Sequence, residues 1–284
     1  MLSRTSPARP DALGDYRVRA RNLARYSANR IHDDAVARTF GYAGGLVAGT
    51  TVYAYLTAPL VAAWGVEWLA RGTATLALHR PVYDGDEVQV TARVVGRSGG
   101  GPAGEIAVEV TATARRDRVA SLVAGLAWGG ASVIPDIGGY PAAAVPAVRP
   151  AASASVLREL EWLGSPALLL DEATVADYAR EVEDPLDLYR GPTAVAHPGL
   201  LLQQANRALS ENVALGPWVH VASDVAHAAP ARVGERLTTR GRVERVFERK
   251  GHEFVELDLL VVADDTRPVM HVRHQAIYQL GIRS

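Results

Sequence analysis

The sequence contains no cysteine among its 284 residues. Disulfide bonds, thiol nucleophiles and cysteine-ligated metals are therefore excluded, while the redox compartment stays open. A charge excess is also missing, because the formal net charge at pH 7 is only -1. Proteins that bind nucleic acid electrostatically are typically basic, so this balance argues against nucleic acid as a partner. The chain is long enough for two ordinary domains or one duplicated domain.

Long uncharged runs are rare. The N-terminal stretch MLSRTSPARPDALGDYRV has no continuous apolar segment, so we see no secretory signal and expect a cytoplasmic protein. The run from 52 to 70, VYAYLTAPLVAAWGVEWLA, carries a single charge, Glu67, and would suffice in length for a membrane span. Pro59 and Gly65 interrupt it. We interpret it as a helix buried inside a soluble domain and expect no membrane partner.

Proline gathers in one segment, residues 135–153, which contains four prolines and is nearly free of charge. Proline fixes φ and lacks a backbone N–H, so a regular helix or central strand is excluded there. We predict a Pro/Ala-rich linker between an N-terminal domain, residues 1–134, and a C-terminal domain, residues 154–284.

The two domains share several features in the same order, which indicates an internal repeat. Each has an apolar helix, expected to begin at about Gly49 in the first domain and at about Gly199 in the second. Each then has a proline four residues before a glycine that an acid follows, in PVYDGD and in PARVGE. Roughly twenty residues later, an acid opens an alternating strand, in EIAVEVTATARR and in EFVELDLLVVAD.

The segments after each helix show the period of two that is typical of strands. Val88, Val90 and Val94 alternate with polar residues, and the glycine-rich stretch GRSGGGPAG at 96–104 predicts a hairpin loop. We therefore predict an α+β fold with two antiparallel sheets, each wrapped round a central helix. Joining the two sheets into one continuous sheet would bury a shared edge.

One stretch, RYSANRIHDDAVARTFGY, places Asn29, His32 and Asp34 ahead of Gly49 at the expected helix start. This pattern, with PVYDGDEV after it, resembles the MaoC-like, (R)-specific enoyl-CoA hydratases and dehydratases of the double hotdog fold. The signature of that family is Asp-x-Asn-Pro-x-His-x-Asp, then a glycine at the start of the central helix, and later Pro-Val-x-x-Gly-Asp. The resemblance covers the first half of the chain, and the second half resembles a degenerate copy.

The resemblance implies a site built on three residues. His32 would be the base or acid of a hydration reaction, and Asn29 would hold the water or the imidazole. The backbone N–H of Gly49, at a helix N-terminus, would polarise the thioester carbonyl. The site would lie between the two halves or between neighbouring chains, with the degenerate copy as the wall of an acyl tunnel.

The sequence departs from the family's pattern at several positions. Ser27 stands where the family has its catalytic aspartate, and Arg30 stands where it has proline. Serine cannot replace a carboxylate as a general base at neutral pH. In the second half Asp184 and Pro185 match the Asn-Pro pair, and Asp187 stands in place of the histidine.

Three functions stay open at this point. The leading one is a lyase of fatty acid metabolism that reversibly hydrates a 2-enoyl-CoA or acyl-carrier-protein thioester, with no metal or other cofactor. We expect Tyr26, Ser27 and Asp34 to contact the substrate, and a homodimer or higher homo-oligomer. The second is a catalytically impaired acyl-thioester-binding or partner subunit. The third is a hotdog thioesterase, a class that usually uses an acidic residue on the central helix, which TTVYAYLTAPLVAAW lacks.

Histidines elsewhere are interpreted as structural. The strand-like stretch HVASDVAH holds His220, Asp224 and His227. The stretch lacks the further close ligand that a metal site needs, so we predict a solvated or interface strand face rather than a metal site. The same interpretation applies to His271 and His274.

Overall fold

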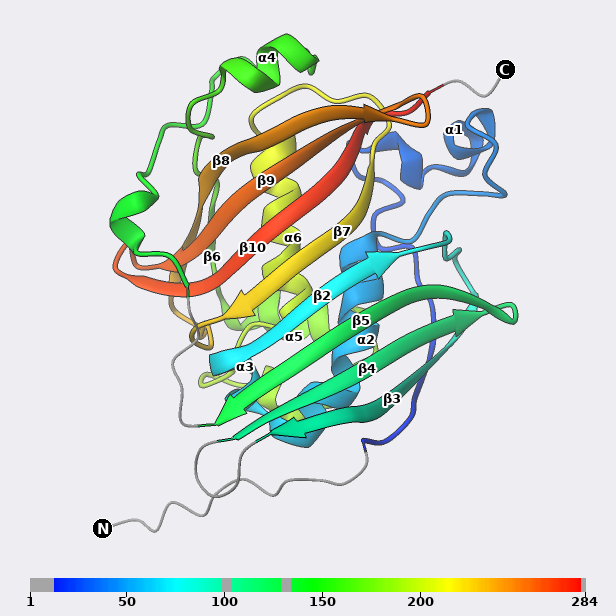
Figure 1. The fold of residues 1–284 in the computed structure, drawn as a ribbon, viewed down its shortest axis with the longest axis vertical. Helices are drawn as coiled ribbons and strands as arrows, with labels where there is room; N and C mark the ends of the chain where they lie inside the picture. The colour runs from blue at the N-terminus through cyan, green and yellow to red at the C-terminus, as the bar shows by residue number, and fades with distance from the viewer. Residues whose placement is uncertain (1–12, 99–103, 129–133, 282–284) are drawn as a thin grey trace.

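The computed structural model describes residues 13–98, 104–128 and 134–281 (Figure 1). These residues form one antiparallel sheet of ten strands, with two long helices packed on the same face of it. Residues 99–103, the middle of the predicted hairpin loop at 96–104, lie outside the described part of the chain.

Both halves of the chain run through a similar series of elements. The N-terminal half contains β1 (Tyr16–Arg19), α1 (Asp34–Thr39), α2 (Gly49–Trp64), α3 (Val66–Arg71), β2 (Gly72–Leu78), β3 (Glu87–Ser98), β4 (Gly104–Ala114) and β5 (Asp117–Trp128). The C-terminal half contains α4 (Ala154–Glu159), β6 (Ala167–Leu169), α5 (Glu172–Glu181), α6 (Pro198–Ser210), β7 (Val219–His227), β8 (Arg236–Arg249), β9 (His252–Ala263) and β10 (Arg267–Gln279). Short 3-10 helices occupy Arg30–His32, Ile137–Gly139 and Asp187–Tyr189.

The strand order shows the duplication. The sheet runs β1-β3-β4-β5-β2-β7-β10-β9-β8-β6, so the second half repeats the order of the first in reverse from the centre. The two halves join where β2 pairs with β7, with Thr73 opposite Ala226 and Ala77 opposite Ala222. This pairing removes an exposed edge from each half. The predicted α+β fold, with two sheets joined into one around two central helices, is confirmed.

The two central helices form the core against the inner face of the sheet. α2 begins at Gly49, as predicted, and α6 begins one residue before the expected Gly199. Nearly every side chain of α2 is buried, including Tyr53, Tyr55 and Leu56, which fits a helix that is apolar on all sides. Among the described residues, no helix is both long and apolar enough to cross a membrane.

The repeated proline–glycine–acid motif forms the turn that leads into β3 and β8. Gly85 and Gly234 adopt φ values of 82° and 94°, a left-handed conformation that favours glycine. The acid after each glycine accepts a hydrogen bond from a backbone N–H three residues earlier, from Tyr83 to Asp86 at 2.9 Å and from Arg232 to Glu235 at 2.8 Å. The repeat in the sequence therefore encodes one turn made twice.

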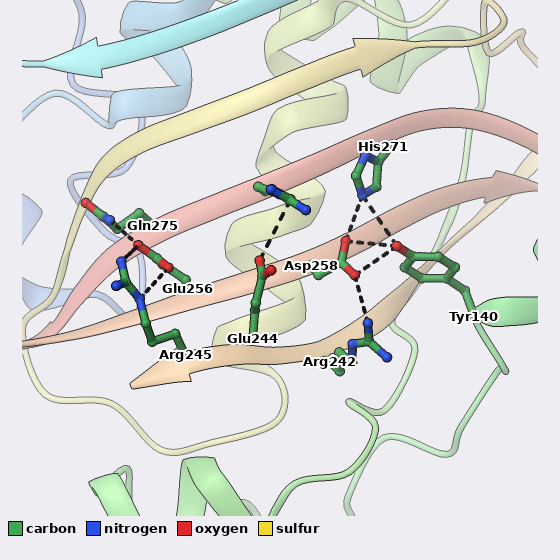
Figure 2. A network of polar contacts seen from close by, with 9 residues as sticks. Tyr140, Arg242, Glu244, Arg245, Glu256, Asp258, His271 and Gln275 are labelled. Atoms are coloured by element: carbon green, nitrogen blue, oxygen red, sulfur yellow. Dashed lines mark hydrogen bonds and ion pairs between the residues drawn. The ribbon is translucent and has the colours of Figure 1, made fainter. Parts of the chain in front are cut away.

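The connecting segment, residues 135–153, is anchored to the outer face of the sheet (Figure 2). The Tyr140 hydroxyl lies 2.8 and 2.9 Å from the two carboxylate oxygens of Asp258, and the His271 imidazole lies 2.7 Å from the same carboxylate. Burial alone would raise the pKa of Asp258, but the hydrogen bonds from His271 and Tyr140, with Arg242 nearby, lower it. The segment is thus fixed in place although it lacks long regular structure.

Candidate functional site

Asn29 joins the two halves of the chain beside the predicted site. Its side-chain oxygen caps the 3-10 helix Arg30–His32 by accepting from the Ile31 N–H at 3.3 Å, and it also accepts from the Trp218 N–H at 3.2 Å. Its amide nitrogen donates to the Trp218 carbonyl at 2.9 Å. Because two N–H groups point at one end and a carbonyl lies at the other, the orientation of the amide is defined.

His32 is held between Asn29 and the loop that precedes α2. Its Nδ1 lies 2.7 Å from the Leu46 carbonyl and its Nε2 lies 3.3 Å from the Asn29 amide nitrogen. A carbonyl can only accept, so Nδ1 carries the proton and Nε2 keeps its lone pair in the neutral ring. Burial lowers the pKa of His32, and the hydrogen bond to Leu46 offsets this only in part. The ring is therefore neutral at pH 7, and the basic Nε2 accepts a hydrogen bond from the Asn29 amide.

Gly49 opens α2 directly beside this pair. No side chain caps the N-terminus of α2, and the first N–H groups of a helix have no partner within it. A Cβ at Gly49 would lie 2.4 Å from Leu78 Cδ1 and 2.6 Å from His220 Nδ1. Any larger residue would displace one of these side chains, so glycine is required here.

Both halves line the cleft that contains these groups. The cleft has a volume of about 300 Å³, and Asn29, His32 and Gly49 lie on its wall together with Trp218 and His220 of the second half. Its apolar wall includes Ile31, Leu46, Val47, Val52, Leu78, Val82, Val219, Val221 and Ile277. The three residues predicted to carry the chemistry therefore lie in one cleft between the halves.

A second cleft of about 210 Å³ adjoins the first. The two share Asn29, His32, Ala48, Asn206 and Trp218, so the histidine lies where they meet. The further walls of the second cleft are more polar and include Ser27, Gln203, Arg149, Arg207 and Ser210. Neither cleft has an aspartate or glutamate among its described lining residues.

The N-terminus of α6, which corresponds to that of α2, is closed. His197 caps α6 by accepting from the Gly199 N–H at 3.0 Å, and its Nε2 lies 3.2 Å from a carboxylate oxygen of Asp184. The rings of Tyr178 and Tyr189 pack on the imidazole with centroid distances of 5.4 and 4.7 Å. All of these side chains are buried. The helix end that is open in the first half is therefore occupied by protein in the second.

The residues predicted to contact the substrate are dispersed. Ser27 lines the second cleft and is exposed, whereas Tyr26 lines neither cleft and is 95% exposed. Asp34 also lines neither cleft: it pairs with Arg25 at 2.8 Å and accepts from the Gly45 N–H at 2.8 Å. The turn into α1 directs Asp34 toward the loop before Gly49, so its carboxylate holds that loop through Gly45. Tyr26 and Asp34 thus lie outside the lining of the two clefts that His32 joins.

His220 is the side chain that the sequence analysis missed. In the pairing of β7 with β10, Ala222 lies opposite Gln275 and His220 lies opposite Ala276, which leaves Val221 as an extra residue. Such a bulge reverses the face to which the preceding side chain points. His220 is therefore 5% exposed rather than solvated, and its ring lines the first cleft.

Two further histidines, His227 and His274, are buried in the core rather than on a solvated or interface strand face. His227 is buried against Trp68, with ring centroids 4.7 Å apart, while Asp224 is exposed on the outer face. His274 is buried behind His220, and the two rings stack at 4.2 Å. Within the described residues, no group of three or more potential ligands converges to hold a metal ion.

Comparison with solved structures gives the fold family. A protein described as a MaoC domain dehydratase from Chloroflexus aurantiacus matches with a TM-score of 0.67 and 12% identity over 99% of this chain and 100% of its own. A conserved hypothetical protein from Mycobacterium tuberculosis with a double hotdog fold matches at 0.64 and 18%, over 94% and 96%. A protein described as an oleoyl thioesterase from Lactobacillus plantarum matches at 0.54 and 11%, over 95% and 97%.

No protein-family model and no curated protein sequence matches the chain. The chain is nevertheless a double hotdog protein, because it is similar over nearly its whole length to structures of that kind. The predicted likeness to MaoC-like dehydratases is confirmed at the level of the fold.

Proposed function

We propose that the protein is a MaoC-like hydratase or dehydratase that reversibly adds water to a 2-enoyl thioester. The observation that carries this proposal is the position of the Asn29–His32 pair beside the open N-terminus of α2 at Gly49, in a cleft with an apolar wall. A base and an oxyanion-stabilising helix end are the two groups that water addition to an enoyl thioester needs.

The reaction follows from the orientation of these groups. The Gly49 N–H would donate to the thioester carbonyl and stabilise the enolate oxygen that forms when water adds to the β-carbon. His32 Nε2 would accept a proton from the water and return a proton to the α-carbon, which gives a 3-hydroxyacyl thioester. Since the Nδ1–H group donates to the Leu46 carbonyl, the reacting nitrogen of His32 is Nε2.

The shape of the two clefts supports a thioester on a phosphopantetheine arm. The first cleft has the apolar wall that an acyl chain requires, and the second carries Arg149, which complements a phosphorylated carrier. Arg207 of the second cleft is paired with Glu211 at 2.7 Å. CoA and acyl carrier protein share this arm, and both remain candidate carriers. We further propose a cytoplasmic homo-oligomer that uses no metal or redox cofactor.

A second candidate is a thioester-binding subunit without turnover. It is favoured by the absence of a carboxylate from the described lining of both clefts, together with serine at position 27. A hotdog thioesterase is the third candidate, and the same lack of an acidic group near α2 argues against it.

Absorbance of the enoyl thioester tests the proposal. Purified protein is expected to remove the conjugated double bond of crotonyl-CoA or of a longer 2-enoyl-CoA, with the 3-hydroxyacyl-CoA as the product. The thiol released by hydrolysis is followed in parallel with a thiol reagent. Loss of absorbance without thiol release supports the hydratase, thiol release supports the thioesterase, and binding without either reaction supports the binding subunit.

A further inference from the structure

Water addition requires an acceptor for each of the water's two O–H groups if its lone pair is to be aimed at the β-carbon. His32 Nε2 supplies one acceptor when the water replaces the Asn29 amide, which lies 3.3 Å from it in the structure. Ser27 is exposed in the second cleft, and no acidic side chain stands among the described residues that line either cleft. The wall also offers two buried acceptors that have no hydrogen-bond partner among the described residues, Asn206 Oδ1 and His220 Nδ1.

The bulge at Val221 turns His220 into this wall from the second half of the chain. Its Nδ1 is buried and has no hydrogen-bond partner among the described residues. The position of a Cβ on Gly49 would lie only 2.6 Å from that nitrogen, so Nδ1 is directed at the start of α2. A buried nitrogen without a partner is unusual unless a ligand or water supplies the partner.

The groups behind His220 determine which nitrogen carries its proton. His220 Nε2 lies 3.1 Å from the Ala222 carbonyl and 2.9 Å from Ser223 Oγ. The carbonyl can only accept, so Nε2 is the protonated nitrogen and Nδ1 keeps its lone pair. Ser223 Oγ lies 2.9 Å from His274 Nδ1 and donates to it. This chain of hydrogen bonds leaves an acceptor, not a donor, facing α2.

The protonation state of His220 agrees with a role as a hydrogen-bond acceptor. Burial lowers the pKa of His220 to about 4, so the imidazole is neutral at pH 7. Two neutral histidines, one from each half, then line the cleft beside the end of α2.

We propose that His220 is a second catalytic residue, whose Nδ1 accepts a hydrogen bond from the attacking water. His32 takes the other proton of that water and returns a proton to the α-carbon, while the water oxygen bonds to the β-carbon. His220 gains and loses no proton over the cycle. This inference rests on the proposed hydration, and it explains how the site works without the carboxylate that Ser27 replaces.

Two apolar substitutions on β7 test the role. His220→Leu is expected to lower kcat for enoyl-CoA hydration by roughly 10²-fold, because the attacking water loses its orientation. Its KM should change little, because the lost contact is to water and not to the thioester. His227→Leu is the matched control: it makes the same change on the same strand, at a buried histidine outside the lining of both clefts. It should keep the wild-type kcat.

Ser223→Ala gives a second measurement that leaves the imidazole in place. It removes one of the two partners of His220 Nε2 and leaves the Ala222 carbonyl as the other. We expect it to lower kcat several-fold with an unchanged KM, and this variant alone decides if His220→Leu does not fold. The inference is overturned if folded His220→Leu keeps the wild-type kcat. If only Ser223→Ala folds, a wild-type kcat in that variant overturns it. In either case the proposed function still stands. Absence of hydration in the wild type removes both.

Discussion

Replacing His32 by alanine is expected to lower kcat/KM for enoyl-thioester hydration by roughly 10²–10⁴-fold. His32 Nε2 carries the lone pair that would accept the proton of the water. The hydrogen bond from Nδ1 to the Leu46 carbonyl sets the orientation of the ring. The alanine variant lacks both the Nε2 lone pair and the hydrogen bond to Leu46. Initial rates of absorbance loss with several enoyl-CoA chain lengths, compared with the wild type, measure the effect.

Two further variants separate chemistry from packing. His32→Gln retains an amide that can donate to Leu46, so it should stay folded and yet be nearly inactive. His271→Gln changes a histidine on the outer face of the sheet (Figure 2) and should leave the rate unchanged. Equal nonzero turnover in the wild type and in His32→Ala would show that the site has been wrongly assigned.

The pH dependence of kcat/KM also tests the role of His32 as the base. Hydration requires neutral His32, and burial lowers the pKa of this residue below the ordinary value of 6.5. The rate should therefore hold as the pH falls through 6.5 and decline only at lower pH. Tyr42, His79, Arg80 and His220 line the same cleft, so the acid limb must disappear from the residual activity of His32→Gln to be assigned to His32.

The second large effect is a loss of stability in mild acid. Burial lowers the pKa of His220 to about 4 and that of His227 to about 3, and it also lowers the pKa of His274 well below 6.5. The unfolded chain binds these protons near pH 6.5, so the folded state is favoured above that pH and loses stability as the pH falls toward 4. His220 and His227 each contribute on the order of 3 kcal/mol to this loss by pH 4.5.

Urea unfolding at pH 7.5 and at pH 4.5 measures this loss directly. A fall of several kcal/mol in the free energy of unfolding is a large part of the 5–15 kcal/mol typical of folded domains. His227→Leu isolates one contribution, because neither ring nitrogen of His227 has a hydrogen-bond partner among the described residues. This variant should be at least as stable as the wild type at pH 7.5 and should lose less stability in acid. An identical pH dependence in the two proteins contradicts the expectation.

The fold was predictable because its signals are local and repeated. The period of two in the strands, the apolar helix from Gly49 and the turn at Gly85 and Gly234 each reflect a backbone conformation that the neighbouring residues determine. The edge strands β1 and β6 were not predicted, since segments of four and three residues are too short to show a period. Their positions depend on pairing with β3 and β8.

The candidate site was only half predictable for a related reason. The motif locates Asn29 and His32 in one short segment, and the helix start supplies Gly49. His220 enters the cleft through a bulge, which depends on how β7 and β10 pair and leaves no mark in the sequence of β7 alone. Asp34 shows the converse, because its spacing matches the motif while the turn into α1 directs its carboxylate to Gly45.

A crystal structure with a bound 3-hydroxyacyl-CoA tests the central claim most directly. We predict that the acyl chain lies in the first cleft, with the thioester carbonyl within hydrogen-bond distance of the Gly49 N–H. The 3-hydroxyl group should then lie within about 3 Å of His32 Nε2. The account is contradicted if the ligand binds elsewhere, or if it binds in this cleft with its hydroxyl group directed away from His32.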